Sequence, residues 1–246
     1  MNKKTALVTG ASRGIGKAIA TLFAESDYNV LINYNNSEKE ALELYNDLKS
    51  RGLSVDTYKA DVSKKEEVNF MVNYCIGRFE SIDVLVNNAG ISRTNLFTDI
   101  SYEEWSEVIN TNLNSVFFTT QKALQYMIPQ MSGKIINISS IWGMVGGSYE
   151  VHYSTSKAAI IGMTKALAKE LGPSNIQVNC IAPGVIKTDM LDNISDDTLE
   201  MLKEETPLMR LGTPNDIAQC ALFLASSNSD FLTGQIISPN GGFVIV

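Results

Sequence analysis

Short runs of β-branched and apolar residues alternate along the chain with segments of helical periodicity. Each run has the length and composition of a buried β-strand. The expected strands are Thr5–Thr9, Val30–Asn33, Val55–Ala60, Val84–Asn87, Lys134–Ser139, Ile176–Ala182 and Gln235–Ser238. Regular alternation of strands and helices favours parallel pairing with right-handed crossovers. The pattern therefore predicts an α/β fold, a Rossmann-type doubly wound parallel sheet of about seven strands with helices on both faces.

The segments between the first strands have the apolar spacing of one-sided helices. Apolar residues recur at the i, i+3, i+4, i+7 and i+8 positions after the first strand, and the next two gaps have similar spacing. These residues are Ile15, Ala18, Ile19, Leu22 and Phe23, then Ala41, Leu44, Tyr45 and Leu48, then Val68, Met71, Val72, Cys75, Ile76 and Phe79. No linker, low-complexity segment or repeat divides the 246 residues. We therefore expect residues 1–246 to form a single domain.

Composition narrows the possible partners and the compartment. The 20 basic and 27 acidic residues leave a net charge of −7, which argues against nucleic acid as a partner. No apolar run approaches the roughly 18 residues of a membrane span, and the apolar stretch after the basic start is too short for a signal peptide. Cys75, Cys180 and Cys220 are odd in number and far apart, in apolar segments that suit buried thiols. These features predict a cytoplasmic protein with no membrane partner.

The first strand-to-helix turn, residues 9–16, reads TGASRGIG and contains Gly10, Gly14 and Gly16. Glycines here permit a tight turn, a close approach of the backbone to a pyrophosphate, and close packing of helix on strand. The helix that follows directs free N–H groups and its positive dipole end toward the phosphates. The spacing matches the general dinucleotide fingerprint only loosely, but the strand before it and the helix after it favour a dinucleotide site over a plain turn.

The same turn also spells Gly-x-Ser-x-Gly, the nucleophile elbow of α/β-hydrolases. A hydrolase needs a histidine base after the acid in the chain, and the single histidine here is His152, in the middle of the sequence. A hydrolase sheet also normally has several strands before the elbow. The hydrolase alternative is therefore much weaker, and we expect His152 to be an accessory or surface residue.

A second motif places a phenol and an ammonium on one helix face. Tyr153 and Lys157 are four residues apart, and Ser140 lies thirteen residues before the tyrosine. A nearby cation favours the ionised phenol, so we expect Lys157 to lower the pKa of Tyr153 toward neutrality. A Tyr-x-x-x-Lys motif is common by itself, and the alternative interpretation is a solvated helix face. The motif indicates catalysis only together with other motifs in the sequence.

Taken together, the motifs resemble those of the classical short-chain dehydrogenase/reductase family. The residues that carry the resemblance are Thr9, Gly10, Gly14 and Gly16, then Asn87-Asn88-Ala89-Gly90, Asn112, Ser140, Tyr153-x-x-x-Lys157 and Pro183-Gly184. The likeness runs from Thr5 to Gly242 and is greatest to the 3-oxoacyl-acyl-carrier-protein reductase branch. It implies that residues 1–246 form one dinucleotide-binding and catalytic domain, which reduces a carbonyl to a secondary alcohol.

The resemblance implies a catalytic tetrad of Asn112, Ser140, Tyr153 and Lys157, with no metal ligand. Tyr153 would give its proton to the developing alkoxide while Ser140 hydrogen-bonds the same oxygen. Lys157 would hold the nicotinamide ribose, and Asn112, in an expected helix over Trp105–Met127, would order a water that reconnects Lys157 to solvent. The neighbouring Ser139 is better interpreted as the last residue of its strand.

The resemblance also assigns residues to the cofactor. They are Gly10, Ser12, Arg13, Gly14, Ile15 and Gly16 in the turn, Asp61 and Val62 around the adenine, Asn88, Ala89 and Gly90 after the fourth strand, Tyr153 and Lys157 at the ribose, and Pro183, Gly184, Ile186 and Thr188 near the carboxamide. Asp61 has an alternative role as an N-cap of the next helix.

The end of the second strand decides between the two nicotinamide cofactors. An NAD enzyme usually has an acid there for the ribose 2′-hydroxyl, whereas this chain reads Asn33-Tyr-Asn-Asn-Ser37 with no acid before Glu38. Arg13 is placed to pair with a 2′-phosphate. We therefore expect NADP(H); the alternative is that Arg13 only packs on the adenine.

Two segments of the sequence bear on the substrate. The stretch of about residues 189–213 mixes methionines and leucines with acids, which suits either a lid over an apolar substrate or an ordinary docked helix. Trp142 and Met144 are expected to line the substrate pocket or simply to pack. The resemblance favours a 3-oxoacyl thioester on acyl-carrier-protein or coenzyme A. The alternatives are a hydroxysteroid, a sugar or a small ketone as substrate, or, more remotely, a non-catalytic dinucleotide sensor.

Two features concern protein partners. Carrier-protein reductases of this branch tend to have basic residues where this chain has Met131-Ser132 and Ser174-Asn175, which weakens the expectation of acyl-carrier-protein as a partner. The chain ends in the apolar tail Phe243–Val246, which a lone domain would expose. We therefore expect burial of this tail against a sister subunit, in the homotetramer that the resemblance implies.

Overall fold

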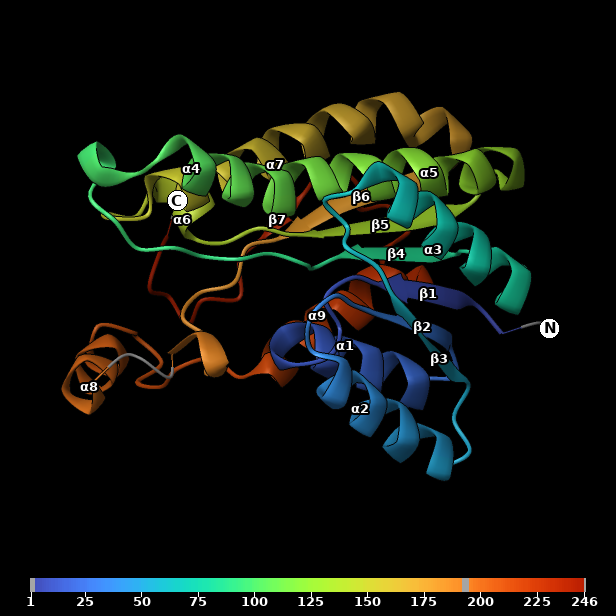
Figure 1. Cartoon of the computed structure of the whole chain (residues 1–246), viewed down its shortest axis with the longest axis horizontal. Helices are drawn as coiled ribbons and strands as arrows, with labels where there is room; N and C mark the ends of the chain where they lie inside the picture. Colours follow the sequence, from blue (N-terminus) through green and yellow to red (C-terminus); the bar gives the residue numbers. More distant parts are fainter. Residues whose placement is uncertain (1–2, 192–194, 246) are drawn as a thin grey trace.

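The computed structural model describes residues 3–191 and 195–245. Its centre is a parallel sheet of seven strands in the order β3-β2-β1-β4-β5-β6-β7 (Figure 1). The strands are β1 (Thr5–Val8), β2 (Asn29–Tyr34), β3 (Val55–Lys59), β4 (Val84–Asn87), β5 (Gly133–Ile138), β6 (Ile176–Ile181) and β7 (Ile236–Ile237). Every expected strand is present, and no boundary differs from its expected position by more than one residue. The prediction of a doubly wound parallel sheet is confirmed.

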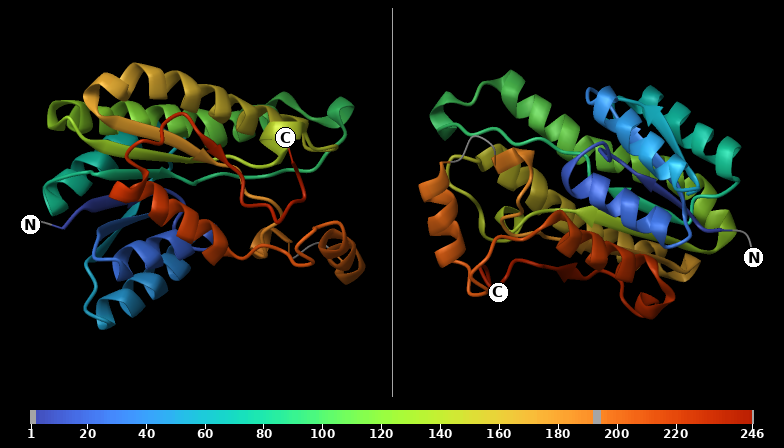
Figure 2. Two further views of the ribbon diagram at one scale, coloured as in Figure 1. Left: turned by 180° about the vertical axis from the view of Figure 1, so that it is seen from behind. Right: turned by 90° about the horizontal axis from the view of Figure 1, so that it is seen from below.

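Helices cover both faces of the sheet (Figures 1 and 2). One layer consists of α1 (Gly14–Glu25), α2 (Glu38–Ser50) and α9 (Pro214–Ala225). The other consists of α3 (Lys65–Phe79), α4 (Tyr102–Ile109), α5 (Ser115–Gln130) and α7 (Val151–Leu171). Two short helices, α6 (Trp142–Val145) and α8 (Asp196–Glu204), lie beyond the carboxyl ends of the strands, where β5 and β6 lead into them.

The two layers are held by alternate residues of the same strands, because successive side chains of a strand point to opposite faces. Val8 packs with α1 and α9 in one core, whereas its neighbour Leu7 packs with α3 and α5 in the other. Both side chains are fully buried. The strands are therefore apolar on both faces, as their composition indicated.

The order of the strands positions the site. β1 pairs with β2 on one side and with β4 on the other, so the chain reverses its direction of winding at β1. At such a switch point the loops after the two strands diverge and leave a crevice at the carboxyl edge of the sheet. The glycine turn follows β1, and the segment Asn88–Gly90 follows β4. The expected cofactor residues of both loops therefore meet there.

One predicted helix is interrupted. The segment Trp105–Met127 is not a single α-helix, because a π-helical turn at Asn110–Asn114 separates α4 from α5. Turns of this kind inside helices occur frequently at functional sites, and this one carries Asn112. Among the residues that the structure describes, no helix combines the length and apolar character needed to cross a membrane.

Candidate active site

The glycines of the first turn are required by close backbone contacts. Gly10 has a φ of +60°, and a Cβ there would lie 2.9 Å from Ala89 Cα. A Cβ on Gly16 would lie 2.4 Å from the Gly10 carbonyl oxygen and 2.5 Å from Asn88 Nδ2. Gly14 also has a positive φ, +53°. Ser12 is buried inside the turn, and Ile15 packs on the core beneath it. The turn is consequently tight, and it lies directly against the loop after β4.

Thr9 and Asn88 join these two loops. Thr9 Oγ1 accepts hydrogen bonds from the backbone N–H groups of Asn88 and Ala89, at 3.0 and 3.1 Å. The Asn88 amide donates in return to the carbonyls of Thr9 and Gly10, at 2.9 and 3.0 Å. The side chain of Asn88 therefore stabilises the glycine turn. The sequence had predicted that Asn88 contacts the cofactor, but its amide bonds the protein backbone.

Asn33 is a supporting residue whose role the sequence did not reveal. It is buried at the end of β2, where its Oδ1 accepts from the Gly10 N–H at 3.1 Å and its Nδ2 donates to the Ala60 carbonyl at 3.1 Å. An amide can do both because it has a donor and an acceptor, whereas an ionised carboxylate only accepts. Asn33, which stands near the position where an NAD enzyme usually has an acid, therefore uses its side chain to fix the glycine turn.

Three of the expected catalytic and cofactor residues converge after β4. A Cβ on Gly90 would lie 3.2 Å from Asn112 Oδ1 and 3.3 Å from Lys157 Nζ. The Asn112 amide is fully buried and holds the backbone of Ile91 on both sides, accepting from its N–H at 2.8 Å and donating to its carbonyl at 2.9 Å. It also donates to Ser156 Oγ at 3.1 Å. Asn112 thus joins the loop after β4 to α7, the helix that carries Tyr153 and Lys157.

Tyr153 and Lys157 lie on one face of α7, as their spacing predicted. Lys157 Nζ is 5.6 Å from the centre of the Tyr153 ring and donates to the Ile138 carbonyl at 2.9 Å. Lys157 is 4% exposed. Ser140 is the second residue after β5 and is 8% exposed, and its Oγ accepts from the Trp142 N–H at 3.2 Å. The phenol, hydroxyl and ammonium groups therefore come from two neighbouring elements.

The expected effect of Lys157 on Tyr153 is wrong for this structure. Burial raises the pKa of Tyr153 to about 12, and a hydrogen bond with Ser140 only partly opposes that rise; the charge of Glu150 adds to it. Burial also lowers the pKa of Lys157 to about 8. Loss of solvation disfavours the charged form of each group and is the largest cause of both shifts. Tyr153 is therefore a neutral phenol at pH 7.

Ser139 and Gly143 pack against the backbone of α7. Ser139 Oγ donates to the Lys157 carbonyl at 2.8 Å, so Ser139 is structural, although it lies one residue beyond the end of β5. A Cβ on Gly143 would lie 2.7 Å from the carbonyl carbon of Lys157. Gly143 thus permits α6 to approach α7 beside Lys157, a role that the sequence did not reveal.

The expected adenine residues have separate environments. Asp61 Oδ1 accepts from the backbone N–H and the hydroxyl of Ser63, at 3.0 and 2.6 Å. Asp61 does not cap α3, whose N-cap residue is Lys64. Val62 is 6% exposed and belongs to the core under α3. Most of the Val62 side chain is therefore not accessible to a ligand.

The loop after β6 borders the candidate site next to Ser140. The Pro183 carbonyl accepts from the Ile141 N–H at 3.0 Å, which joins this loop to the residue after Ser140. Gly184 permits contact with Asn240, since a Cβ there would lie 2.7 Å from the Asn240 Cα. Ile186 is 7% exposed and forms an isolated bridge with Gly212. The Ile186 side chain therefore points into the core and leaves only its backbone for a ligand.

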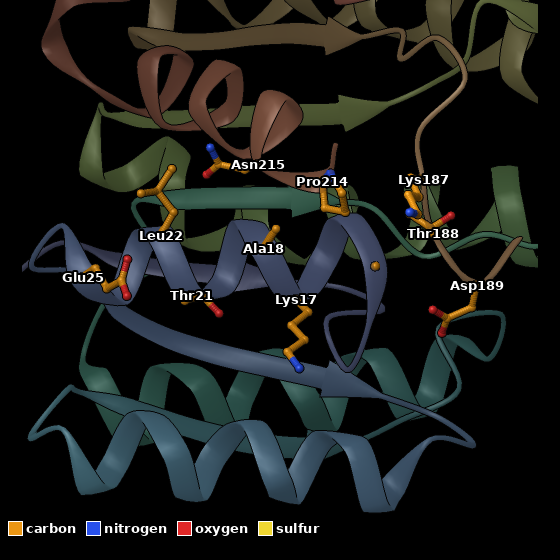
Figure 3. A pocket seen from close by; sticks show the side chains of 11 residues that line it. Lys17, Ala18, Thr21, Leu22, Glu25, Lys187, Thr188, Asp189, Pro214 and Asn215 are labelled. Carbon is orange, nitrogen blue, oxygen red and sulfur yellow. The ribbon is translucent and has the colours of Figure 1, made fainter. Parts of the chain in front are cut away.

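An open groove lies beside the glycine turn (Figure 3). It is lined by Gly14, Lys17, Ala18, Thr21, Leu22, Glu25, Lys187, Thr188, Asp189, Pro214 and Asn215. Arg13, whose side chain is 64% exposed, has its guanidinium 3.7 Å from the Asp189 carboxylate at the same end. The groove follows α1 away from Tyr153, so only its Gly14–Thr188 end coincides with the expected cofactor residues.

The lid and the tail contact each other within the chain. The Leu208 N–H donates to the Gly241 carbonyl at 3.1 Å, and Phe243 meets Trp142 edge to face with ring centroids 6.2 Å apart. The expectation that a lone domain exposes the whole tail is therefore wrong for Phe243, while Ile245 is 87% exposed. Val246, and residues 192–194 of the expected lid, lie outside the described residues.

The prediction of a surface position for His152 is also wrong. His152 is fully buried beside Tyr153, with Nε2 2.9 Å from Glu104 Oε1. The sequence did contain a signal. His152, Ser156, Ile160, Thr164 and Ala168 recur every four residues, and all five are buried on one stripe of α7. Their mixed polarity concealed that stripe from a search for apolar periodicity.

Comparison with known proteins agrees with this geometry. A family model described as enoyl-(acyl carrier protein) reductase matches residues 10–244. A 3-oxoacyl-[acyl-carrier-protein] reductase FabG of Staphylococcus aureus is 46% identical, with 97% of each chain covered. A protein of the same name from Chlamydia trachomatis is 47% identical, over 97% of this chain and 96% of its own. The chain belongs to the short-chain dehydrogenase/reductase family. Members of this family are oxidoreductases that act on CH–OH groups with a nicotinamide dinucleotide, so a binding protein without enzymatic activity is disfavoured.

Proposed function

We propose that the protein is an NADPH-dependent reductase that converts a 3-oxoacyl thioester of acyl-carrier-protein to the 3-hydroxyacyl form. The observation that carries the proposal is the convergence of Gly90, Asn112 and Lys157 next to Tyr153 and Ser140 at the switch point of the sheet. The similarity to proteins named 3-oxoacyl-[acyl-carrier-protein] reductase supports the choice of substrate.

The residues present fit a dinucleotide. Gly10 and Gly16 leave no space for side chains between the turn and the loop after β4, so a pyrophosphate can approach backbone N–H groups at the start of α1. The twelve-residue helix α1 places its positive end there. Gly90, Lys157 and the backbone at Ile186 are placed to hold the nicotinamide half. When bound, the nicotinamide supplies the hydride.

The chain's own residues supply and orient the proton. Because burial raises the pKa of Tyr153 to about 12, the phenol is protonated at neutral pH and is ready to donate to an alkoxide, which is far more basic. The Trp142 N–H occupies one acceptor position of Ser140 Oγ. The Ser140 hydroxyl, which hydrogen-bonds Tyr153 in this structure, would turn its proton to the substrate oxygen when substrate binds, so that two donors stabilise the charge that develops there.

Lys157 provides a cation whose proton can exchange near physiological pH. Its pKa of about 8 lies close to neutrality, so the ammonium can lose and regain a proton at low cost. Asn112, whose amide is occupied by Ile91 and Ser156, fixes the loop around that ammonium. We propose that reprotonation of Tyr153 passes by way of Lys157.

The choice of NADPH rests on charge at the end of β2. Asn33 uses its amide within the fold, and the first acid after it, Glu38, is 3.5 Å from Lys59. No carboxylate in the described part of that loop is therefore placed for a 2′-hydroxyl. Arg13 is exposed, and its weak contact with Asp189 leaves its charge available for a 2′-phosphate.

The absence of basic residues at positions 131–132 and 174–175 is only a weak argument against acyl-carrier-protein as a partner. Met131 and Ser174 precede β5 and β6, so they lie at the amino edge of the sheet, opposite Ser140. Asn175 donates from its amide to the Met131 carbonyl at 3.3 Å, which confirms that the two positions adjoin. The absence of basic residues at these positions therefore does not directly affect the entrance to the candidate site of the same chain.

The test is a comparison of steady-state rates. Acetoacetyl-acyl-carrier-protein, acetoacetyl-coenzyme A, crotonoyl-acyl-carrier-protein, a steroid ketone and a small ketone are each assayed with NADPH and with NADH. We expect the highest kcat/KM for acetoacetyl-acyl-carrier-protein with NADPH. A preference for the crotonoyl substrate would instead indicate an enoyl reductase, and a preference for a free ketone would contradict the thioester assignment.

We also propose that the enzyme works in the cytoplasm as a homotetramer. Cys75 and Cys180 are buried as free thiols and Cys220 is half-buried, which suits a reducing compartment. Ile245 and residues on the outer faces of α4 and α5, such as Tyr102 and Phe117, remain exposed and apolar. Light scattering at micromolar concentration is the test, and a mass near the 26.9 kDa of one chain would refute the assembly.

A further inference from the structure

His152 is a buried titratable residue that the proposed reaction does not use. It lies in the first turn of α7, one residue before Tyr153. Its Nε2 is 2.9 Å from Glu104 Oε1. Because an ionised carboxylate can only accept, Nε2 carries a proton and donates it. Among the residues that the structure describes, Nδ1 has no partner. The contact with Glu104 is thus the one side-chain hydrogen bond that this buried imidazole makes within the described residues.

Glu104 receives a second contact, from the loop after β4. The same carboxylate accepts from Asn95 Nδ2, at 3.0 Å for one oxygen and 3.3 Å for the other. Glu104 itself is fixed near the start of α4, where Ser101 Oγ caps its backbone N–H at 3.1 Å. Its side chain is 20% exposed. The carboxylate therefore links His152 on α7 to Asn95 on the loop.

Asn95 ends the segment Ile91–Asn95, which runs past the catalytic residues. At the start of the segment, Asn112 holds the backbone of Ile91. In the middle, the Ser92 hydroxyl donates to Glu150. At the far end, the Asn95 N–H donates to the Tyr149 carbonyl at 2.9 Å. The segment is thus tied at one end to the catalytic Asn112, and at the other to the residues that lead into Tyr153.

We infer that His152 is a positioning residue for substrate. It holds Glu104, Glu104 holds Asn95, and the segment Ile91–Asn95 forms the wall of the acyl site beside Tyr153. This inference rests on the proposed reductase function for its kinetic test. His152 reaches substrate only through this chain of contacts and takes no part in proton transfer. Its loss should weaken binding of the acyl thioester more than it changes the chemical step or the affinity for NADPH.

Four variants test the inference in the full-length protein. His152→Leu removes the contact with Glu104, and His152→Gln keeps an N–H donor near the Nε2 position. Asn95→Ala breaks the other end of the link at a half-buried residue, so this variant should fold even if His152→Leu does not. Thr164→Val is the control. Thr164 is equally buried on α7, but it bonds with Asn137 of β5, far from the segment.

We expect His152→Leu and Asn95→Ala to raise KM for acetoacetyl-acyl-carrier-protein by about tenfold each, the effect of one lost hydrogen bond in the wall. kcat and the NADPH Kd should change by less than about twofold, and His152→Gln should recover most of the KM. Combining the two damaging substitutions should add little, because both break the same link. Thr164→Val should leave KM unchanged.

A second readout does not depend on activity. Hydrogen–deuterium exchange at the Asn95 amide should speed up by about tenfold in His152→Leu, and remain at the wild-type rate in His152→Gln and Thr164→Val. If the wild type turns over no acyl thioester, the proposed function is wrong. Hydrogen–deuterium exchange then remains as the test of the contacts from His152 through Glu104 to Asn95. Unchanged exchange at Asn95 together with unchanged KM in Asn95→Ala would overturn the inference. So would equal effects of His152→Leu and Thr164→Val on KM.

Discussion

We expect the substitution of alanine for Gly16 to lower both the stability of the protein and its affinity for NADPH, although it adds only one methyl group. The new Cβ would lie 2.4 Å from the Gly10 carbonyl oxygen, 2.5 Å from Asn88 Nδ2 and 2.9 Å from Ala11 Cα. Ordinary contacts of this kind begin near 3.4 Å. Because two of these atoms belong to the backbone, the turn itself must open by about 1 Å, which is a large displacement for a closely packed interior.

The expected cost can be worked from these contacts. Overpacking of a tight site costs about 1–3 kcal/mol. Opening the turn also weakens the two hydrogen bonds from the Asn88 amide to Thr9 and Gly10, at about 1 kcal/mol each. Alanine recovers about 1 kcal/mol through its helix propensity. We therefore expect a net loss of about 2–4 kcal/mol, or about 5–15 °C in Tm for a chain of this size.

The same displacement should weaken cofactor binding. Moving the backbone N–H groups of the turn removes at least one charge-assisted contact with a pyrophosphate, which corresponds to about a 10- to 100-fold rise in the NADPH Kd. Kd is measured by NADPH fluorescence titration, and stability by thermal and urea unfolding. Both measurements use the same purified variant, so a loss of affinity can be separated from a loss of folded protein.

Gly77 offers a matched control. It lies in α3, is exposed, and has no atom within 4 Å of the position of an added Cβ. Gly77→Ala should therefore stabilise the protein by about 1 kcal/mol through helix propensity and leave NADPH binding unchanged. If Gly16→Ala melts within about 2 °C of the wild type and binds NADPH within about twofold, our account of the turn is wrong.

Three further substitutions test the site. Tyr153→Phe should lower kcat by about 10²–10⁴ while NADPH still binds, and a variant with most of the wild-type rate would exclude Tyr153 as the proton donor. Arg13→Ala should weaken NADPH by about 10- to 100-fold and NADH much less, whereas equal losses in a titration of both would refute a 2′-phosphate contact. For Lys157, burial lowers the folded pKa to about 8 from 10.5, so the unfolded chain binds more protons between those values. The free energy of unfolding of the wild type should rise relative to Lys157→Met from pH 8 to pH 10, by about 2–3 kcal/mol in urea titrations, and a flat difference would contradict the burial of the charge.

The backbone of the site could be predicted because its requirements are local. Gly10 and Gly16 stand where a strand meets a helix, and the need for glycine there follows from the geometry of a single turn. The spacing from Tyr153 to Lys157 needs only one turn of helix to place both groups on one face. Such patterns depend on neighbours in the sequence, and the structure has the predicted elements in place.

Predictions that depended on distant parts of the chain were less successful. The π-helical turn at Asn112 keeps the apolar spacing of an α-helix on both sides, so periodicity could not reveal it. The raised pKa of Tyr153 follows mainly from its burial in the fold, which its spacing to Lys157 does not reveal. The contact between Phe243 and Trp142 joins residues about a hundred positions apart. Each of these results from tertiary packing, for which a local pattern carries no signal.

The polar stripe of α7 explains how such a long helix is placed to the accuracy that catalysis needs. An apolar stripe alone can slide by a turn at little cost, since one methyl contact replaces another. Hydrogen bonds cannot be exchanged in this way, because a displaced buried donor loses its partner. Ser156 accepts from Asn112 at 3.1 Å, and the Lys157 carbonyl, one residue further on, accepts from Ser139 Oγ at 2.8 Å. These two bonds fix the rotation and the axial position of the part of α7 that carries Tyr153, and with them the position of Tyr153 opposite Ser140.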